Sequence, residues 1–327
     1  MKHHHAVIYG YTQQPGHHIH THSYIHRGYV EGFLYLGIPT YWVDPRHANH
    51  PEFRNIFKNA LVFTEAWTLQ NMPLDKSSTY AVHYLGNKGA MEANPGPDYF
   101  KNAGVKFFDV RYNADRWTDK NYDYTLDRSK CTKIGSGSYF EKGDNGYDYM
   151  YTLFGTDLLP NQINLEDRFI TRDTSKYAFF AGTIRPDNEG MVNPFIKACT
   201  ESGVKFIHNN SWTTPLTTEE IRQKVSKAYI APDFRGETTH LAWNYIPCRT
   251  MKNISYGHLG VTNSKAVCEF FNGDIGYNAD PYMMFYDSVS KLNDFEMIGR
   301  QMQFVKDHHT YVNRVNELIE VADDYAS

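Results

Sequence analysis

The stretch HAVIYGYTQQPGHHIHTHSYIHRGYVEGFLYLGIPTYWVD, residues 5–44, contains the unit from which the fold can be predicted. The hydrophobic run His5–Tyr11 predicts a buried strand, and a loop rich in Gly, Pro and Gln follows it. From Thr21 on, apolar residues recur at steps of three and four, which predicts a helix that ends at Gly37. TYWVD, Thr40–Asp44, is a second predicted strand. A strand, a loop, a helix and a strand in this order indicate a parallel, doubly wound sheet.

The same alternation continues through the first half of the chain. Three further strands are predicted, at Ala60–Glu65, Thr79–Gly86 and Val105–Tyr112. Residues 113–155 are rich in Asp, Gly, Tyr and Ser and show little periodicity, so we expect loops there, with room for an edge strand.

A second alternation begins at Lys176, where YAFFAGTIR predicts a strand that enters a glycine-containing loop. TTEEIRQKVSKA opens like a helix with a capping box, because a Glu follows a Thr at the required spacing. The other predicted elements are a helix at Met191–Ser202, strands at Val204–Asn209, Ala228–Asp233 and Leu259–Asn263, a helix at Arg249–Gly257 and one long helical pattern at Asn293–Ala322.

These two series predict an α/β protein with two Rossmann-like domains that face each other across a cleft. We expect an N-terminal acceptor domain at 1–165, a C-terminal nucleotide-sugar domain at 166–295, and a helix at 296–327 that packs back on the first domain. In such folds ligands bind at the carboxyl ends of the parallel strands.

Composition narrows the classes of protein to consider. The chain has 327 residues, of which 15% are aromatic, with 25 Tyr. Tyrosine on this scale suits surfaces that stack on sugar rings, and it suits a tyrosine-rich core equally well. A formal net charge of −4 gives no electrostatic footprint for nucleic acid.

The four cysteines lie far apart without a CxxC pair, so we expect neither a zinc site nor a disulfide framework, and a cytoplasmic, reducing location. No apolar run approaches the ~18 residues of a transmembrane helix. The run His3 to His5 is typical of an appended affinity tag, and we assign it no function.

The stretch YIPCRTMKNISYGHLGVTNS, Tyr245–Ser264, places a basic residue at a predicted helix start. Arg249 stands where an extended segment enters the helix, which closes at Tyr256 and Gly257. A helix N-terminus with a cation beside it can bind a diphosphate. A lone arginine can equally be salt-bridged at the surface.

Further candidate binding residues lie at the ends of predicted strands. AGTIR offers a turn at Gly182 and Thr183 and a second basic residue, Arg185, and the later strand ends in Thr262 and Asn263. Two basic residues at matching places in the alternation favour binding of a phosphorylated donor over an ordinary surface role.

At these two stretches, and at HTHSYIHR, the chain resembles GT-B glycosyltransferases, particularly small ones of large DNA viruses and some bacteria. In that family a nucleotide-sugar donor lies against the C-terminal domain, with its diphosphate on a basic residue and a helix N-terminus. YIPCRTMKNISYG matches this position, and the resemblance implies that Asn293–Ala322 crosses back to the first domain. As architecture it covers the whole chain.

The chain departs from the family in one respect. Many retaining members have a Glu-x7-Glu pair near this helix, whereas Arg249–Gly257 contains no glutamate, so the anomeric outcome stays open. The chain also lacks a convincing Asp-x-Asp motif of the metal-dependent GT-A type, which favours transfer without an essential metal.

The histidine-rich stretch GHHIHTHSYIHR, Gly16–Arg27, allows three interpretations. His18, His20 and His22 alternate like the metal ligands of amidohydrolase barrels, but the eight βα units of such barrels are missing. The second interpretation is a polar helix start. The third is acceptor recognition, with His20 or His22 as the general base, because the pKa of histidine lies near working pH. His26, one turn deeper on the same helix face, is expected to be structural.

Acidic residues at strand ends give further candidates. Asp44 and Glu65 each end a predicted strand, and Glu65 is a candidate base in place of histidine or a group that orients it. Trp67 either stacks on a sugar ring or belongs to the core.

Together these features predict a glycosyltransferase that moves a sugar from a nucleoside-diphosphate sugar to a hydroxyl of a carbohydrate or glycoprotein. Its partners would be this donor substrate and a glycan acceptor, with no other cofactor. A non-catalytic sugar- or nucleotide-binding protein on the same scaffold is the first alternative, and a metal-dependent hydrolase that uses the histidines is the second.

Overall fold

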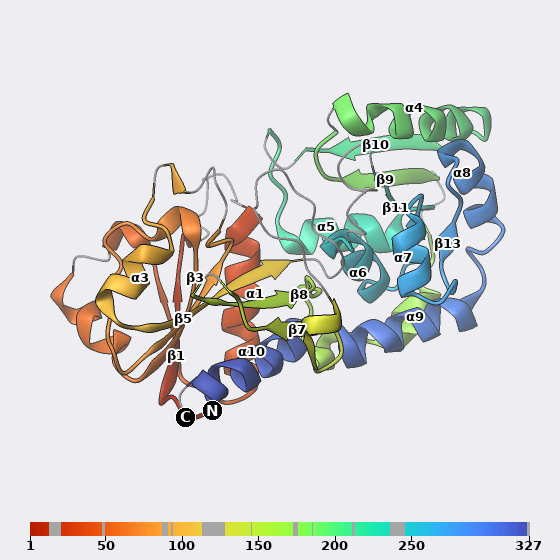
Figure 1. Cartoon of the computed structure of the whole chain (residues 1–327). Coiled ribbons are helices and arrows are strands. Elements are labelled where there is room, and N and C mark those ends of the chain that lie inside the picture. Colours follow the sequence, from red (N-terminus) through yellow and green to blue (C-terminus); the bar gives the residue numbers. More distant parts are fainter. Residues whose placement is uncertain are drawn as a thin grey trace. The chain divides into compact units, whose positions relative to one another are not determined.

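The structure, a computed structural model, divides into two units that are described separately. Unit 1 comprises Met1–Phe154 and Tyr311–Ser327, and unit 2 comprises Gly155–Thr310 (Figure 1). The sequence placed these divisions at residues 165 and 295 instead. The residues described are 1–12, 21–47, 50–86, 91–92, 94–112, 128–144, 146–172, 176–184, 186–210, 213–235 and 246–325.

Unit 1 is built on an eight-stranded, mostly parallel sheet with the order β2-β1-β3-β4-β5-β8-β7-β6. The order of its first five strands reverses between β1 and β3, which is the switch point of a doubly wound fold. Its strands are β1 (His5–Tyr9), β2 (Thr40–Val43), β3 (Ala60–Glu65), β4 (Thr79–His83), β5 (Lys106–Tyr112), β6 (Thr132–Ile134), β7 (Ser138–Glu141) and β8 (Asp148–Thr152).

The expectation of loops at residues 113–155 is wrong for its second part. β8 pairs in parallel with β5, and β7 and β6 continue the sheet in antiparallel order. These strands have only three to five residues, too few for a clear period in the sequence. They are held by aromatic contacts, such as Arg111 over the ring of Tyr149 at 4.6 Å.

One face of this sheet is covered by two helices that approach each other closely, α1 (Thr21–Tyr35) and α10 (Tyr311–Tyr325) (Figure 1). A Cβ atom on Gly28 would lie 2.3 Å from the ring of Tyr311, so only glycine fits there. Tyr29 of α1 stacks on Phe63 of β3 with 4.1 Å between the ring centroids. The sequence predicted α1 with nearly these bounds.

The second face of the sheet carries a hydrophobic core beneath α3 (Pro97–Ala103) and the 3-10 helix η2 (Pro51–Phe57). The remaining 3-10 helices of unit 1 are η1 (Pro45–His47), η3 (Ala66–Thr68) and η4 (Arg128–Lys130). The core includes Val7, Tyr9, Phe57, Val62, Leu69, Tyr80, Val82, Leu85, Phe100 and Phe107.

The N-terminal histidines belong to this folded unit. His5 begins β1, and its Nε2 atom lies 2.6 Å from the carbonyl oxygen of Ile56. His3 is buried. The two chain ends lie together (Figure 1), since the terminal ammonium and Lys2 both contact Asp323. His3 and His5 are therefore packed into the folded structure of unit 1.

Unit 2 contains parallel strands in the order β10-β9 and β11-β12-β13. A parallel bridge between Ala178 and Ile230 places β9 next to the segment that leads into β11. Its strands are β9 (Tyr177–Ala181), β10 (Lys205–Asn209), β11 (Pro232–Asp233), β12 (Val261–Thr262) and β13 (Gly276–Tyr277).

The helices of unit 2 connect these strands, and α4 packs against α8 while α5 packs against α6. The predicted capping box of α5 is present, because Thr217 and Glu220 bind each other's backbone N–H. The helices are α4 (Pro186–Glu201), α5 (Thr218–Lys227), α6 (Cys248–Ser255), α7 (Lys265–Phe270), α8 (Pro281–Val289) and α9 (Phe295–His308), with 3-10 helices η5 (Pro160–Gln162) and η6 (Leu165–Phe169).

The single helix expected at Asn293–Ala322 is two helices. α9 ends at His308, and α10 begins at Tyr311 in the other unit. Thr310 bridges to Thr156 in strand fashion, and the Thr156 N–H donates to the carbonyl of His309 at 2.9 Å. The periodicity continues across this break, which is why the sequence did not reveal it.

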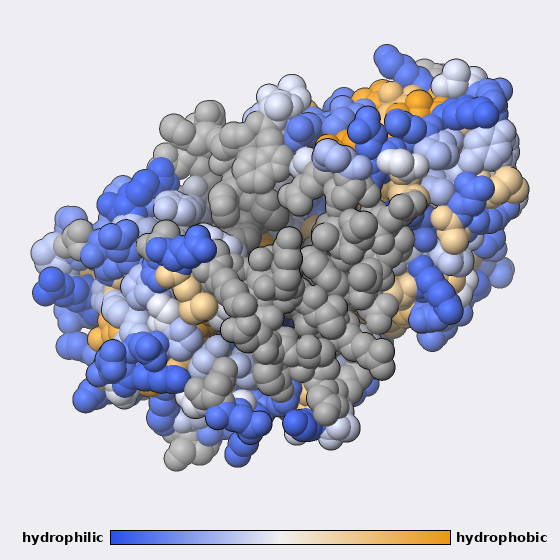
Figure 2. Space-filling model, turned by 45° about the horizontal axis from the view of Figure 1, so that its top comes forward, coloured by the Kyte–Doolittle hydropathy of each residue, from blue (hydrophilic) through white to orange (hydrophobic). Residues whose placement is uncertain are grey.

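On the face shown in Figure 2, hydrophilic residues cover most of the described surface, and hydrophobic residues form small separate groups. No helix among the described residues is both long and apolar enough to cross a membrane.

Candidate functional site

The carboxyl ends of the unit 2 strands bring several predicted binding residues together. β9 ends at Ala181 and β11 ends at Asp233, on the two sides of the point where the strand order reverses. In doubly wound folds ligands bind at this switch point. We call these strand ends, together with the start of α6, the carboxyl edge of unit 2.

Arg249, in the first turn of α6, lies across this switch point. Its Nε donates to the carbonyl of Ala181 at 2.7 Å, and its Nη1 donates to Oδ1 of Asp233 at 2.7 Å. The guanidinium also lies over the ring of Phe180, 4.3 Å from the centroid. The side chain is 22% exposed. Two of its five N–H donors are thus used, and the other three have no partner among the described residues.

Position 182 requires glycine, because the guanidinium of Arg249 occupies the space that a side chain would fill. A Cβ atom on Gly182 would lie 2.0 Å from Nη2 of Arg249. Gly182 donates its N–H to the carbonyl of Asn209 at 2.9 Å, so the turn after β9 is anchored to β10. The sequence paired Gly182 and Arg249 as members of one site, and the structure brings them into contact.

Asp233 is shared by two arginines. Arg235 donates from Nε to Oδ2 at 2.7 Å, and from Nη2 to the same Oδ1 that Arg249 contacts. Asn263, another predicted residue, fixes the backbone of Arg235 from both sides, at 2.7 and 3.0 Å. Asp233 thus forms ion pairs with both Arg235 and Arg249. Sequence reasoning missed Asp233 and Arg235, although Asp233 is the last residue of the predicted strand Ala228–Asp233.

The N-cap residue of α6 is Pro247, and no side-chain cap is present at this helix start among the described residues. The first N–H groups of a helix have no partner within the helix, and the helix dipole gives this end a partial positive charge. The edge therefore combines backbone donors with a guanidinium, a set suited to an anion.

Tyr256, Gly257 and Thr262 make structural contacts. The Tyr256 hydroxyl donates to Asp157 at 2.7 Å, and burial together with this carboxylate raises the pKa of Tyr256 far above its usual value. Gly257 has a left-handed φ of 83°, and a Cβ there would lie 2.4 Å from the carbonyl oxygen of Asp167. The hydroxyl of Thr262 accepts the Ser264 N–H at 3.1 Å. These contacts position α6 and the loop after β12.

The remaining predicted binding residues are less informative. The carbonyl of Thr183 accepts the side-chain amide of Asn188 at 3.4 Å, which links the turn to α4. Arg185 lies outside the described residues.

At the carboxyl edge of unit 1, Glu65 is the last residue of β3 and lies in register with His83, the last residue of β4. Both are fully buried. The next residue, Tyr84, has a left-handed φ of 59° and its ring lies 3.8 Å from that of His83. Such a conformation is rare for an aromatic residue and concentrates at functional sites. Sequence reasoning missed His83, although it lies within the predicted strand Thr79–Gly86.

The predicted histidine bases are only partly described. His20 lies outside the described residues, and so does the side chain of His22, whose backbone lies in the first turn of α1. His26 is buried, and its ring occupies the space beside Gly10 at the end of β1, where a Cβ would lie 2.0 Å away. The structural role expected for His26 is confirmed.

Asp44 is held as an anion and is therefore unsuited to act as a base. Burial disfavours its charged form, but hydrogen bonds from Arg46 and Thr12 outweigh burial and lower its pKa below the usual range. Trp67, in contrast, is exposed at the end of β3.

We expect the Asp233 cluster to stabilise unit 2. Removing one partner of a buried ion pair leaves charge uncompensated, so Asp233→Asn should lower the free energy of unfolding by about 3–5 kcal/mol. Urea denaturation followed by circular dichroism measures this. The matched control is Asp274→Asn, because Asp274 forms the same two-bond fork with exposed Arg300. Equal stability of both variants would contradict a role for Asp233 in holding the edge together.

Comparison with known proteins gives one informative result. No family model and no curated protein sequence matches the chain. Among solved structures, AviGT4, described as a glycosyltransferase involved in Avilamycin A biosynthesis, is similar with a TM-score of 0.52. Sequence identity is 12%, and the match covers 98% of both chains. At this identity the likeness shows the fold: over its whole length the chain shares the fold of a glycosyltransferase.

Proposed function

We propose that the protein is a glycosyltransferase that takes a sugar from a nucleoside-diphosphate sugar and transfers it to a hydroxyl of a carbohydrate or glycoprotein. The fold of the full chain supports a transferase of this class. The observation that carries the proposal is Arg249 in the first turn of α6, in contact with Gly182 at the switch point of unit 2.

The proposed role of Arg249 is to stabilise the diphosphate that leaves. As the bond from the sugar to the diphosphate breaks, negative charge grows on the phosphate oxygens, and preorganised donors lower the barrier most. Arg249 is fixed by Ala181 and Asp233 yet keeps three N–H donors that have no partner among the described residues. Because a guanidinium and backbone N–H groups would contact the diphosphate, we propose that the transfer needs no metal.

The acceptor hydroxyl must lose a proton during transfer. We assign this role to His22 or His20 at the start of α1, with Glu65 as the alternative. At a pH well below its pKa a histidine is protonated and cannot act as a base. A carboxylate has a lower pKa and therefore remains a base at lower pH. Trp67, two residues after Glu65, is exposed and offers a flat apolar surface on which a sugar ring could stack.

A nucleoside diphosphate should stabilise the protein against heat. At 100 times its dissociation constant a ligand raises stability by about 2.7 kcal/mol, which thermal-shift screening with UDP, GDP, CDP and dTDP would detect. The shift should persist in EDTA. If none of the four diphosphates raises the melting temperature, the proposed donor site is wrong. If the melting temperature rises but no sugar is transferred, the protein is better described as a non-catalytic binding protein.

Arg249→Ala should lower the transfer rate by about 10²–10³-fold, the usual cost of losing such a stabiliser. The fold should survive, because Asp233 keeps its two bonds to Arg235. Arg249→Lys should rescue the rate only in part, since lysine lacks the planar fork.

Gly182→Ala offers a second route to the same defect, because its methyl group would displace the guanidinium. The double variant should then be no worse than either single one, since both remove one interaction. The matched control is Arg222→Ala, which removes an arginine paired with Asp167 on the same unit. Additive losses in the double variant would show that Gly182 and Arg249 act separately.

The base can be identified from pH–rate profiles. His20→Ala or His22→Ala should lower the rate by about 10²–10⁴-fold with little change in donor affinity. In the wild type the rate should fall as the pH drops through about 6.5, where an unshifted imidazole gains its proton. If both histidine variants stay active and Glu65→Gln is inactive, the carboxylate is the base.

A further inference from the structure

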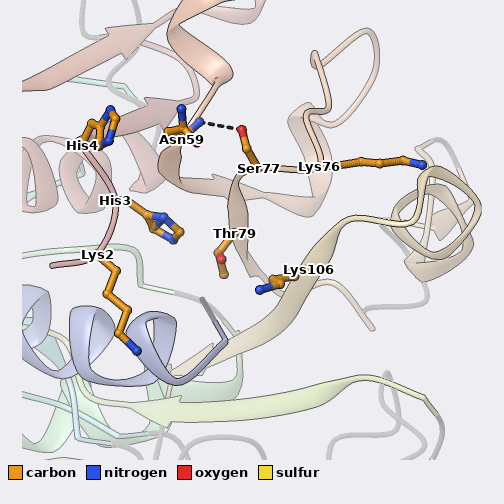
Figure 3. A pocket seen from close by; sticks show the side chains of 8 residues that line it. All are labelled: Lys2, His3, His4, Asn59, Lys76, Ser77, Thr79 and Lys106. Atoms are coloured by element: carbon orange, nitrogen blue, oxygen red, sulfur yellow. Dashed lines mark hydrogen bonds between the residues drawn. The ribbon is translucent and has the colours of Figure 1, made fainter. Parts of the chain in front are cut away.

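A polar cavity of about 240 Å³ opens at the amino ends of the strands of unit 1, the edge opposite to Glu65 and His83. The residues that line it are Lys2, His3, His4, Asn59, Lys76, Ser77, Thr79 and Lys106 (Figure 3). Three of these residues are lysines, and none is acidic. We call this cavity the amino-edge pocket.

Two buried polar atoms of this pocket have no hydrogen-bond partner among the residues that the structure describes: Nε2 of His3 and Oγ1 of Thr79. The two residues are 8% and 0% exposed. A buried polar group without a partner costs about 1–3 kcal/mol, so such groups are uncommon in folded proteins unless a ligand or water satisfies them. Figure 3 shows the His3 ring directed towards Thr79 across the pocket.

Lys106 supplies positive charge at the same place. It begins β5 in register with Thr79, which begins β4, and its ammonium group lies beside Thr79 in Figure 3. Lys106 forms no ion pair with any described residue. The other lysines are directed elsewhere: the Lys2 ammonium donates to the carbonyl of Asp323 at 2.8 Å, and Lys76 extends away (Figure 3).

We propose that the amino-edge pocket binds a small oxyanion with the size and charge of inorganic phosphate. The ammonium of Lys106 and the hydroxyl of Thr79 can both donate to its oxygens, as can His3 with its proton on Nε2. Burial lowers the pKa of His3, so the imidazole is a neutral donor at neutral pH. A cation would be repelled, and a neutral ligand would leave the ammonium without a partner of opposite charge.

The volume of the pocket agrees with this ligand. A water molecule occupies about 30 Å³ of liquid, so the pocket has room for a tetrahedral anion and a few waters. The site belongs to unit 1 and uses none of the residues proposed to bind the nucleotide sugar, so the two proposals stand or fall separately.

Isothermal titration of the full chain with inorganic phosphate, at constant ionic strength set with chloride, tests this site. One phosphate should bind, and Lys106→Met should weaken it by about 10- to 100-fold, the worth of a hydrogen bond to a charged group. Lys133→Met, at an exposed lysine of β6 outside the pocket, should bind as the wild type does. Arg249→Ala should also keep this binding, which separates the pocket from the donor site.

Thr79→Val provides the sharper variant, because it removes one hydroxyl at nearly constant volume. Without phosphate, the free energy of unfolding of Thr79→Val should be at least that of the wild type, because the variant lacks the buried hydroxyl that has no partner among the described residues. Its affinity for phosphate should fall, as that of Lys106→Met does. Wild-type binding by both variants, or no phosphate binding by the wild type at millimolar concentration, would overturn the proposal.

Discussion

The carboxylate of Asp233 holds two arginines where the strand order of unit 2 reverses, and the candidate donor site depends on this contact. Oδ1 of Asp233 accepts hydrogen bonds from both Arg235 and Arg249, so this one carboxylate fixes the position of both guanidinium groups. Asn263 and Ala181 complete the arrangement by holding the backbone of Arg235 and the Nε of Arg249. A preorganised cation of this kind need not rearrange when a diphosphate arrives.

Much of the fold follows from local pattern. β3 begins and ends where the sequence predicted, and α5 has its capping box, because hydrophobic runs and capping residues act over a few neighbours. The strands β6 to β8 are too short to show a clear period, and β8 joins the sheet by pairing with β5, which lies far from it in the sequence. The break between α9 and α10 has a different cause, since the helical period runs through His309 and Thr310.

The candidate site could be predicted where a residue's position alone determined its neighbours. Gly182 ends a strand and Arg249 begins a helix, so the doubly wound order brings them together. Asp233 lies at a strand end too, but its pairing with two arginines depends on side-chain geometry that no spacing reveals. Predicting His83 would have required the register between β3 and β4, because that register places it beside Glu65. The burial of His3 could not be predicted, because a run of identical residues shows no pattern of buried and exposed positions.

Because α10 belongs to unit 1 and follows unit 2 in the chain, the two units are completed at different times during synthesis. Unit 2 is one continuous segment, so all of it has left the ribosome once Thr310 has emerged. Unit 1 is interrupted by unit 2, and α10, whose Tyr311 packs against Gly28, is made after unit 2. Domains generally fold as units in the order in which they are completed. The part of the N-terminal sheet that α10 covers can therefore be covered only after the whole of unit 2 has been made.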